Sequence, residues 1–476
     1  MIEHIIFILY ILLFIFSTIG HGEIFFRIFY KELLNYNVGY KGLVGFFSIS
    51  LISLLSSYFF AHNFLHNIIL HIFGMLGFFL FLNSNKENLN EFKNFIILLL
   101  ILLIGSYVYK NHDDFPYYHL TYALNLSENK FIIGTGIFSH GFRTFSSLFY
   151  YHSTLYLPFI KFYLFHIGPF FILVFFNFII LKNLFEKIKK NKVNFLYYFS
   201  ILSLIFVDIA FYRIGEHGTD RSAQILLLLI FLIFFDLIFF EKKEKNILIK
   251  INLILILIFM ASSMKAIYYL YLLLVPIILI SRNYILKFFT KKNIFIILVL
   301  SVCLSGNLVT NYFNTGCFLY PAEKTCLGKT PWSIPKEHVK KMKLHYEWWS
   351  KAGGGPGYSS EMKQEKYVDN FNWVSNWIDR HFFNKVSDTL FGIMFICLIF
   401  YVSFRNLSLN IKTNNLSKSK LMAASTIPFI FLLEWFVNHP SMRYGGYVLI
   451  ALPFFILTSY QLQKINQISR FYGGCS

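Results

Sequence analysis

Two adjacent carboxylates, Asp113 and Asp114, follow directly after an apolar stretch in the segment VYKNHDDFPYYHL, which spans residues 108–120. An unpaired charge so close to lipid costs about 3 kcal/mol, so a pair of them needs an explanation. A carboxylate at a membrane surface can take the proton from an acceptor hydroxyl. Two carboxylates together could also bind a divalent cation such as Mg²⁺ or Mn²⁺, and no other cofactor is indicated.

The doublet also precedes a predicted helix, which allows a purely structural interpretation. Pro116 favours a helix at about 117–128, with Tyr117, Tyr118 and His119 in its first turn. An acid placed just before that turn stabilises the helix N-terminus through the helix dipole. Capping accounts for one of the two carboxylates, but not for both.

Charged side chains recur in three further short segments. They are Arg213, Glu216, His217, Asp220 and Arg221 in RIGEHGTDR, Lys265 in ASSMK, and Arg443 just after His439-Pro440. A departing phosphate needs no general acid, but it needs cations and N–H donors to hold its charge. The Arg and Lys side chains could supply that charge, or they could instead extend to the headgroups of outer-leaflet phospholipids.

The composition is that of an integral membrane protein. Of the 476 residues 56% are hydrophobic and only 14% are charged, whereas soluble domains carry roughly 25% charged residues. The net charge of +19 would suggest a nucleic-acid partner in a soluble protein. Here most of the basic residues lie in short links between apolar segments, where anionic lipid and the insertion machinery explain them, so nucleic acid is excluded as a partner.

Thirteen apolar stretches are long enough to cross the roughly 30 Å hydrocarbon core of a bilayer as helices. They lie at about 2–19, 41–60, 64–82, 94–109, 167–185, 195–212, 222–240, 247–262, 264–282, 293–311, 387–405, 420–438 and 443–461. The first stretch lacks a basic leading region and a small-residue cleavage site, so we expect a first span and not a cleavable signal peptide.

The links rich in Lys and Arg, such as 186–192, 241–245 and 287–292, predict which ends of the spans are cytoplasmic. The remaining links and loops then face outward together, and they contain every strong polar cluster outside the basic links. The polar clusters lie in the outward segments 110–166, 213–221, 312–386 and 438–443, and the short links 61–66 and 263–265 are predicted to lie on the same side.

The apolar run at 146–166 is ambiguous. If it crossed the membrane, the basic link at 186–192 would face outward, so we expect a helix lying in the outer interface. Tyr150, Tyr151, His152 and Tyr156 would then meet the lipid headgroups. The alternative is an additional span.

The insert at 312–386 carries five of the six tryptophans. Flat aromatic faces suit the apolar side of a sugar ring, which makes Trp348 and Trp349 candidates for substrate binding, although packing is the expected role of most of the five. Cys317 and Cys326 enclose a short loop on the side where an oxidising compartment would permit a disulfide; otherwise they are free thiols. Three histidines at 62, 66 and 71 are expected to pack as polar groups, not to bind metal.

An outward loop that opens with Asp-Asp after a span, followed by pairs of spans and a late outer insert, resembles the GT-C superfamily of polytopic glycosyltransferases. DDFPYYHL in particular is similar to the loop of an uncharacterised bacterial membrane-protein family of that kind. The apolar stretches predict an all-α bundle of about 13 transmembrane helices, with interfacial helices in the first outer loop and a small outer soluble insert. The resemblance would cover a seven-helix module at 94–311, with a three-helix extension at 1–93 before it, and the insert at 312–386 and three final spans at 387–476 after it.

The resemblance also implies an activity, transfer of a sugar from a polyprenyl-phosphate donor to a glycan, lipid or protein acceptor of the cell envelope. It would take place at the outer, periplasmic face of a bacterial inner membrane. The expected catalytic residues are Asp113, Asp114, Glu216 and Asp220. The expected substrate-binding residues are Arg213, Arg221, Lys265, Arg443, His119, His217, Trp348 and Trp349.

Two other classes of protein stay open. A polysaccharide polymerase or ligase of the O-antigen type would also have many spans and a large late outer loop, and its chemistry would rest on Arg and His residues there. A transporter or flippase should place charges at mid-membrane depth and broken helices in matching halves. Pro276 and Pro428 lie inside predicted spans but not at matching positions.

Overall fold

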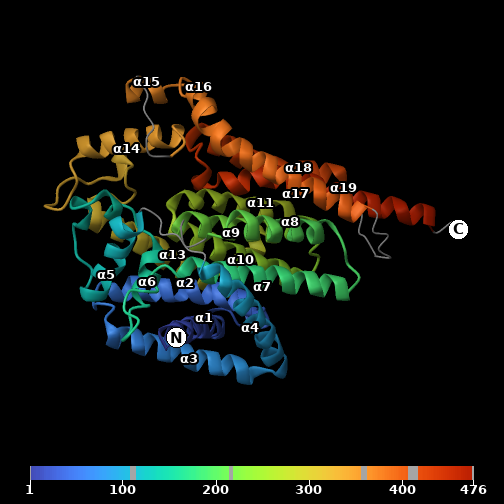
Figure 1. The fold of residues 1–476 in the computed structure, drawn as a ribbon, viewed down its shortest axis with the longest axis horizontal. Coiled ribbons are helices and arrows are strands. Elements are labelled where there is room, and N and C mark those ends of the chain that lie inside the picture. The colour runs from blue at the N-terminus through green and yellow to red at the C-terminus, as the bar shows by residue number, and fades with distance from the viewer. Residues whose placement is uncertain (1, 108–113, 214–217, 355–361, 406–415, 474–476) are drawn as a thin grey trace. The chain divides into compact units, whose positions relative to one another are not determined.

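The computed structural model describes residues 2–107, 114–213, 218–354, 362–405 and 416–473 of the chain (Figure 1). The regular structure in these ranges is entirely helical, and no strand occurs in them, as the composition and periodicity predict. Two compact units can be distinguished. The first comprises residues 1–179, 213–226 and 242–336, and the second comprises residues 180–212, 227–241 and 337–476.

The first unit contains the N-terminal helices, the loop that begins at Asp114 and the disulfide loop. Its elements are α1 (Ile2–Phe29), η1 (Lys31–Leu33), α2 (Val38–Ser57), α3 (Phe64–Ser84), α4 (Lys86–Tyr107), η2 (Phe115–His119), α5 (Leu120–Glu128), η3 (Thr135–Ile137), η4 (His140–Phe142), α6 (Ser147–Ser153), α10 (Glu244–Met264), η6 (Ala266–Leu273), α11 (Leu274–Arg282), α12 (Ile285–Phe288), α13 (Lys291–Thr315) and η7 (Glu323–Thr325). Helices α7 (Gly168–Lys189) and α9 (Gly218–Phe239) begin in this unit and end in the second.

The second unit contains the other part of the tryptophan-rich insert and the last long helices. Its elements are α8 (Phe195–Ala210), α14 (Lys336–Lys351), α15 (Gln364–Val368), α16 (Val374–Trp377), η8 (Ile378–Val386), α17 (Ser387–Arg405), α18 (Lys418–Asn438), η9 (Met442–Tyr444) and α19 (Gly446–Gly473). The insert expected at 312–386 is therefore divided between the units near Lys336. The four sequence-based domain boundaries stay a prediction.

Ten helices within the described residues are long and apolar enough to cross a membrane. They are His4–Phe29, Val38–Ser57, Phe64–Ser84, Gly168–Lys189, Gly218–Phe239, Glu244–Met264, Asn293–Thr315, Val374–Arg405, Lys418–Asn438 and Gly446–Ile465. The other three predicted stretches fall on α4, on α8 and on η6 with α11. A helical membrane bundle is thus confirmed, whereas the total of thirteen spans stays a prediction.

Several helix boundaries follow directly from the local sequence. The Asn37 side chain accepts a hydrogen bond from the backbone N–H of Tyr40, and Asn63 does the same for His66, so that α2 and α3 each begin at an asparagine cap. At the other end of a helix, Gly316 adopts φ of 78° and ends α13 in the left-handed conformation that glycine tolerates best.

Helices α1, α2 and α3 pack with unusually close backbones. Gly20 faces the backbone of Gly74 on α3, and Gly45 on α2 faces the backbone of Thr18, so that a Cβ atom at either glycine would overlap a carbonyl oxygen. Small residues permit this approach between membrane helices, where van der Waals contact replaces the hydrophobic effect as the force that holds helices together.

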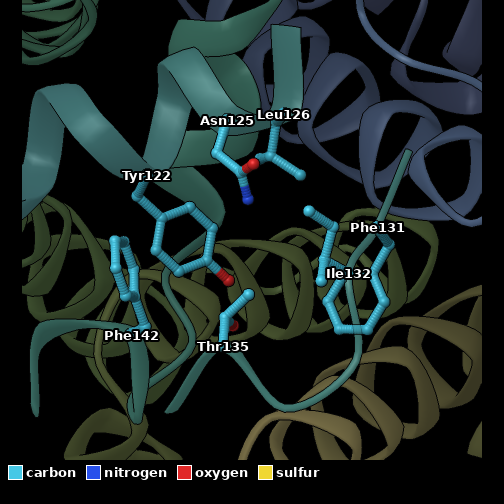
Figure 2. A pocket seen from close by; sticks show the side chains of 7 residues that line it. All are labelled: Tyr122, Asn125, Leu126, Phe131, Ile132, Thr135 and Phe142. Atoms are coloured by element: carbon cyan, nitrogen blue, oxygen red, sulfur yellow. The ribbon is translucent and has the colours of Figure 1, made fainter. Parts of the chain in front are cut away.

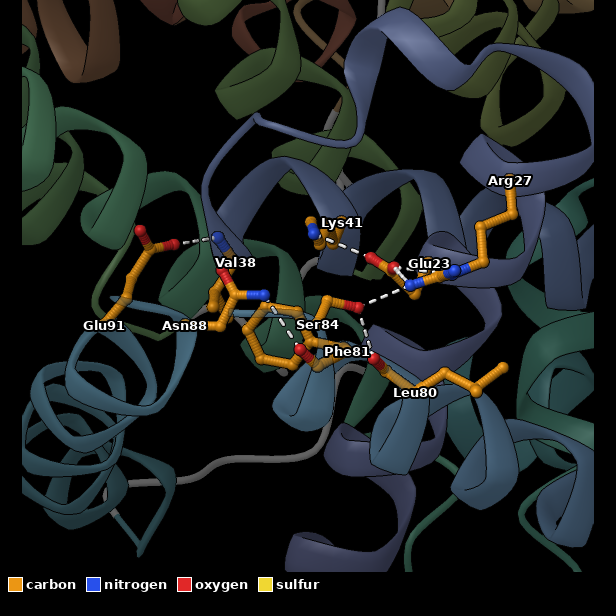
Figure 3. A network of polar contacts seen from close by, with 9 residues as sticks. All are labelled: Glu23, Arg27, Val38, Lys41, Leu80, Phe81, Ser84, Asn88 and Glu91. Carbon is orange, nitrogen blue, oxygen red and sulfur yellow. Dashed lines mark hydrogen bonds and ion pairs between the residues drawn. The ribbon is translucent and has the colours of Figure 1, made fainter. Parts of the chain in front are cut away.

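A buried ion pair joins the same helices near one end (Figure 3). Lys41 Nζ lies 2.7 Å from Glu23 Oε2, and Arg27 binds the other carboxylate oxygen at the same distance. The side chains of Glu23 and Lys41 are only 1% and 2% exposed. The Lys41 ammonium also lies 4.6 Å from the centre of the Phe81 ring. None of these residues was a candidate on sequence grounds.

Lys41→Met should destabilise the first unit strongly, because Glu23 would keep a buried charge with only Arg27 beside it. Loss of one partner of a buried pair costs about 3–5 kcal/mol. The measurement is the midpoint of thermal unfolding in detergent. Unfolding is detected as reaction of the buried Cys303 thiol, in a protein that also carries Cys397→Ser and Cys475→Ser. The double variant Glu23→Gln/Lys41→Met should recover most of the loss, and Lys287→Met in the exposed pair with Glu244 should change little. Equal unfolding midpoints for Lys41→Met and Lys287→Met would contradict this prediction.

The ambiguous run at 146–166 forms neither an additional span nor a long interfacial helix. Its only regular α-helix is α6, seven residues long and too short to cross a bilayer, followed by turns that lead into α7. All residues of α6 are buried, so the prediction that Tyr150, Tyr151 and His152 meet lipid headgroups is wrong.

The physical reason is that the protein itself covers these aromatic rings. Tyr151 stacks on Phe46 of α2 with ring centres 3.8 Å apart, and its hydroxyl lies 2.8 Å from Thr18 Oγ1 of α1. The aromatic and polar side chains of the run therefore pack against α1 and α2 and do not lie at the membrane–water interface. Tyr156 alone of the predicted headgroup contacts is half-buried.

Candidate functional site

Segments that the distribution of basic residues places on the outer side come together within the first unit. The backbone N–H of Phe131 donates to Ser57 O, and the Thr135 hydroxyl donates to Asn314 Oδ1 over 2.9 Å. Arg143 donates to the carbonyl of Gly136 and to the hydroxyl of Tyr320. Loop 114–146, the end of α2 and the first part of the insert therefore form one connected polar region.

Asp114 lies at the entrance to this region. It precedes η2, which continues directly into α5, so the helix expected at 117–128 is present and begins two residues earlier. The Asp114 side chain makes no capping hydrogen bond, and its Oδ2 lies 3.4 Å from the hydroxyl of Tyr118 one turn later. Asp114 therefore stays in place to stabilise η2 through the helix dipole, but no capping hydrogen bond occupies its carboxylate. Asp113 lies outside the described residues.

A second carboxylate is held in an ion pair. Asp220, in the first turn of α9, binds the ammonium group of Lys265, which follows the last residue of α10. The side chains are 4% and 23% exposed, so the pair is largely withdrawn from water. The ion pair places the first turn of α9 beside the last turn of α10. This contact agrees with the prediction that links 213–221 and 263–265 lie on the same side of the membrane.

His119 lies next to the start of α9. A Cβ atom at Gly218, the first residue of that helix, would lie 3.6 Å from Cε1 of the imidazole, which is ordinary van der Waals contact. Gly218 has φ of 35°, a conformation that favours glycine. His119 follows Tyr118, whose hydroxyl lies near Asp114, so η2 and the start of α9 are neighbours in the first unit.

Two further histidines continue from His119, since His152 lies near both His119 and His166. His152, on α6, is buried, and burial together with the nearby His166 and His119 lowers its pKa well below the ordinary value. Burial also lowers the pKa of His166 to about 4. Both imidazoles are therefore neutral at pH 7, and Nε2 of His152 makes no hydrogen bond with any described residue. A neutral imidazole can donate or accept a hydrogen bond without adding charge to the site.

The remaining basic candidates of link 213–221 are placed differently from one another. Arg221 is buried in the first turn of α9, next to Asp220, whereas Arg213 is exposed. Glu216 and His217 lie outside the described residues. Asp114, His119, Asp220, Arg221 and Lys265 are thus the sequence-predicted residues that the first unit brings to one end of its helices.

Three of the predicted substrate-binding residues belong to the second unit. Trp348 and Trp349 lie on α14 and are half-buried, and Arg443 lies on η9 with its guanidinium 5.9 Å from the centre of the Tyr444 ring. The hydroxyl of Ser441 donates to Gly353 O, so the loop before α19 contacts the end of the α14 region. Within this unit too, segments predicted to face outward contact one another.

Most of the insert's aromatic and sulfur side chains have structural roles. Trp373 and Trp377 are buried and pack on Phe436, as expected for most of the tryptophans. Cys317 and Cys326 are joined in a disulfide, which closes the loop that the sequence analysis marked as a candidate. No three side chains of His, Cys, Asp or Glu gather as a metal site within the described ranges. A divalent cation at Asp113 and Asp114 stays a prediction.

The hydrogen bonds that fix α6 in place were not predicted. His62, just before α3, lies 2.7 Å from Ser153 Oγ. His71, on α3, lies 2.9 Å from Thr154 O. Asn67, between them, lies within hydrogen-bond distance of Ser153 O. The spacing of the histidines indicated polar packing, but nothing in the sequence indicated α6 as the partner.

These features define the class of protein. The chain is an all-helical, polytopic membrane protein in which acidic, basic and imidazole side chains gather at one end of the first unit. It belongs to the family described as a domain of unknown function, DUF8201, whose model matches residues 4–450. No functionally curated protein and no solved structure is detectably similar to it.

Proposed function

We propose that the protein is a membrane glycosyltransferase that moves a sugar from a polyprenyl-phosphate donor to an acceptor hydroxyl. The observation that carries the proposal is that Asp114 and the Asp220–Lys265 pair lie in the same unit, with His119 of η2 next to Gly218 at the start of α9. One acts on the acceptor and the other on the donor. The resemblance of the Asp-Asp loop to GT-C enzymes supports the same assignment.

In this reaction Asp114 accepts the proton of the acceptor hydroxyl, and the hydroxyl oxygen attacks the anomeric carbon of the donor sugar. The bond between that carbon and the phosphate oxygen breaks, and the phosphate leaves with the electron pair. Lys265 stabilises the charge on the departing phosphate, since a cation that is largely withdrawn from water acts more strongly there. Asp220 positions Lys265. Asp113 and Glu216 are further candidate acids from the sequence alone.

The remaining predicted residues act on the substrates. Arg213, Arg221, His217 and Arg443 are candidates for phosphate contacts, and Trp348 and Trp349 for contacts with a sugar ring. The distribution of basic links favours an active face on the outside of a bacterial inner membrane, with acceptors in the cell envelope. A divalent cation, if one is used, would be bound by Asp113 and Asp114 and would supply further positive charge to the phosphate.

The experiment is a transfer assay on the full-length protein in lipid nanodiscs. Short-chain polyprenyl phosphates that carry single radiolabelled sugars are mixed with envelope glycans, and release of the free polyprenyl phosphate is measured. We expect release that depends on both the protein and the acceptor. Release that is unaffected by loss of Asp114 but abolished by loss of Arg443 or His439 would favour a polymerase or ligase. ATP-independent movement of the intact donor between leaflets, without release, would favour a flippase.

A further inference from the structure

We infer that helix α14 binds an acidic oligosaccharide, so that the acceptor is a negatively charged glycan. The inference rests on the proposed function and adds a substrate class to it, sugar chains with acidic substituents. Helix α14, Lys336–Lys351, belongs to the tryptophan-rich insert that is predicted to face outward. Its surface combines ammonium groups that have no partner with flat aromatic rings.

The free cations of α14 lie in its first half. Lys340, Lys341 and Lys343 are all exposed, and none of them makes an ion pair with a described residue, the nearby Glu337 included. Lys340 and Lys343 are three residues apart, so they lie on the same side of the helix and repel each other. A chain of negatively charged sugars would remove that repulsion and bind several ammonium groups at once.

Membrane topology does not account for these lysines. Lys and Arg are expected in cytoplasmic links, where they orient the spans. The segment KEHVKKMK at 336–343 carries four lysines, although the insert around it is predicted to face outward. Lys351, at the end of the same helix, has a structural role: its Nζ lies 2.8 Å from Glu347 Oε1, and its side chain is only 8% exposed. The exposed lysines of α14 have no such role.

Aromatic rings continue from the lysines along one face of α14. Lys341, His345 and Trp348 are spaced at i, i+4 and i+7, which places them on the same side of the helix. The ring of His345 lies 5.5 Å from that of Trp348 and 6.3 Å from that of Trp349, centre to centre. All three residues stay partly exposed. Such rings can contact the apolar face of a sugar while the Lys341 ammonium binds its acidic group.

This arrangement distinguishes a glycan from a lipid surface. A helix that lies in the membrane interface keeps its basic residues on the polar face and its aromatic residues on the other face. On α14, in contrast, Lys341 and the rings of His345 and Trp348 share one side. A neutral sugar would not need the cations, and a bare anion would not need the rings, so a sugar with an acidic group fits both.

Helix α14 is held in place before a ligand binds. Val339 is fully buried near its start, and near its end the Lys351 ammonium donates to Val368 O over 2.9 Å. The exposed lysines and the partly exposed rings lie between these two anchors. Because the helix does not have to be ordered on binding, little of the binding free energy is lost to conformational entropy.

The test measures binding of short oligogalacturonates to the full-length protein in phosphatidylcholine nanodiscs by ligand-observed NMR. The methyl ester of the same oligosaccharide is the neutral probe, because it keeps the sugar rings and loses the charge. We expect the acid to bind about tenfold more tightly than the ester, and Lys340→Gln/Lys341→Gln/Lys343→Gln to remove that difference. His345→Ala should weaken binding of both the acid and the ester, since it removes a ring.

The matched control is Lys363→Gln/Lys366→Gln/Lys385→Gln, which removes the same number of positive charges from exposed lysines of the second unit outside α14. It should bind oligogalacturonate as the natural protein does. Equal weakening by the two triple variants, or ester that binds as tightly as the acid, would overturn the inference.

Acetylation of lysines, read by mass spectrometry, locates the contact. Oligogalacturonate should protect Lys340, Lys341 and Lys343 from acetylation. Protection of the same lysines in phosphatidylglycerol nanodiscs without any glycan would assign them to lipid headgroups and overturn the inference.

The outcomes separate the inference from the proposed function. Absence of oligogalacturonate binding would overturn the acidic acceptor even if transfer to a neutral glycan is observed. Binding that needs the α14 lysines, in a protein that does not release polyprenyl phosphate from any donor, would support the inference and remove the proposed reaction. The unfolding midpoint of each variant is measured alongside, and Lys340→Arg/Lys341→Arg/Lys343→Arg must retain binding if charge is what matters.

Discussion

Asp114→Asn should reduce sugar transfer by about 10²- to 10⁴-fold while the protein stays folded. The amide keeps the size of the carboxylate but cannot accept the acceptor's proton, and general-base catalysis contributes a factor of that order. The Asp114 side chain makes no capping hydrogen bond to η2, so its replacement should cost only the helix-dipole contribution, about 0.5 kcal/mol, and leave the helix intact. The measurement is release of polyprenyl phosphate in nanodiscs, at saturating donor and acceptor, so that the loss appears in kcat.

The matched control for this variant is Glu128→Gln, which neutralises an exposed acid at the other end of α5. It should retain full activity. Tyr118→Phe removes the hydroxyl near Asp114 and should lower kcat by less than Asp114→Asn, because the carboxylate stays in place. Comparable activity of Asp114→Asn and Glu128→Gln would exclude Asp114 as the base and shift attention to Asp113.

Lys265→Met should lower transfer by about 10²- to 10³-fold, the effect typical of removing one group that stabilises charge in a transition state. The change also leaves Asp220 with a charge in a site where its side chain is only 4% exposed, so stability should fall as well. Lys265→Arg keeps the positive charge and should retain more activity than Lys265→Met. Transfer and unfolding midpoints are both measured for the two variants.

A double variant separates catalysis from stability at this pair. Asp220→Asn/Lys265→Met carries no charge at either position, so its stability should approach that of the natural protein while its transfer stays low. If the pair were only structural, the double variant would regain transfer together with stability. Titration of a polyprenyl phosphate without sugar gives a second readout, because loss of Lys265 should weaken its binding and loss of Asp114 should not.

Contacts could be predicted from the sequence where they depend only on which side of the membrane a link faces. Asp220 and Lys265 lie on links predicted to face the same side, and the structure pairs them. The disulfide between Cys317 and Cys326 could be named as a candidate for the same reason, since both cysteines fall in one short outer loop. The all-helical fold followed from composition and the length of the apolar stretches.

Sequence reasoning failed where side chains meet inside the packed helices, because sidedness does not indicate which faces of the helices touch. Glu23 and Lys41 each appear as single charges near the ends of apolar stretches, and nothing local indicates that they are buried together. The aromatic run at 146–166 has the composition of an interfacial helix, because Tyr side chains suit headgroups and protein interiors equally well. Whether protein or lipid surrounds this run depends on how α1 and α2 pack against it. The hydrophobic periodicity of the sequence does not specify that packing.

A small pocket after α5 was not predicted either (Figure 2). Four of its lining residues, Tyr122, Asn125, Thr135 and Phe142, are common residue types at spacings that match no motif. They converge only because α5 and the following turns fold back on each other.

The hydrogen bonds from α3 to α6 bear on how the protein is made. His71 and its carbonyl partner on Thr154 are separated by 83 residues, so during synthesis the histidine enters the bilayer well before the group that satisfies it. Until α6 arrives, the first three helices carry polar side chains without their final partners. The N-terminal helices are therefore inserted first and form their final hydrogen bonds only when α6 packs on them, so they cannot reach their native packing alone.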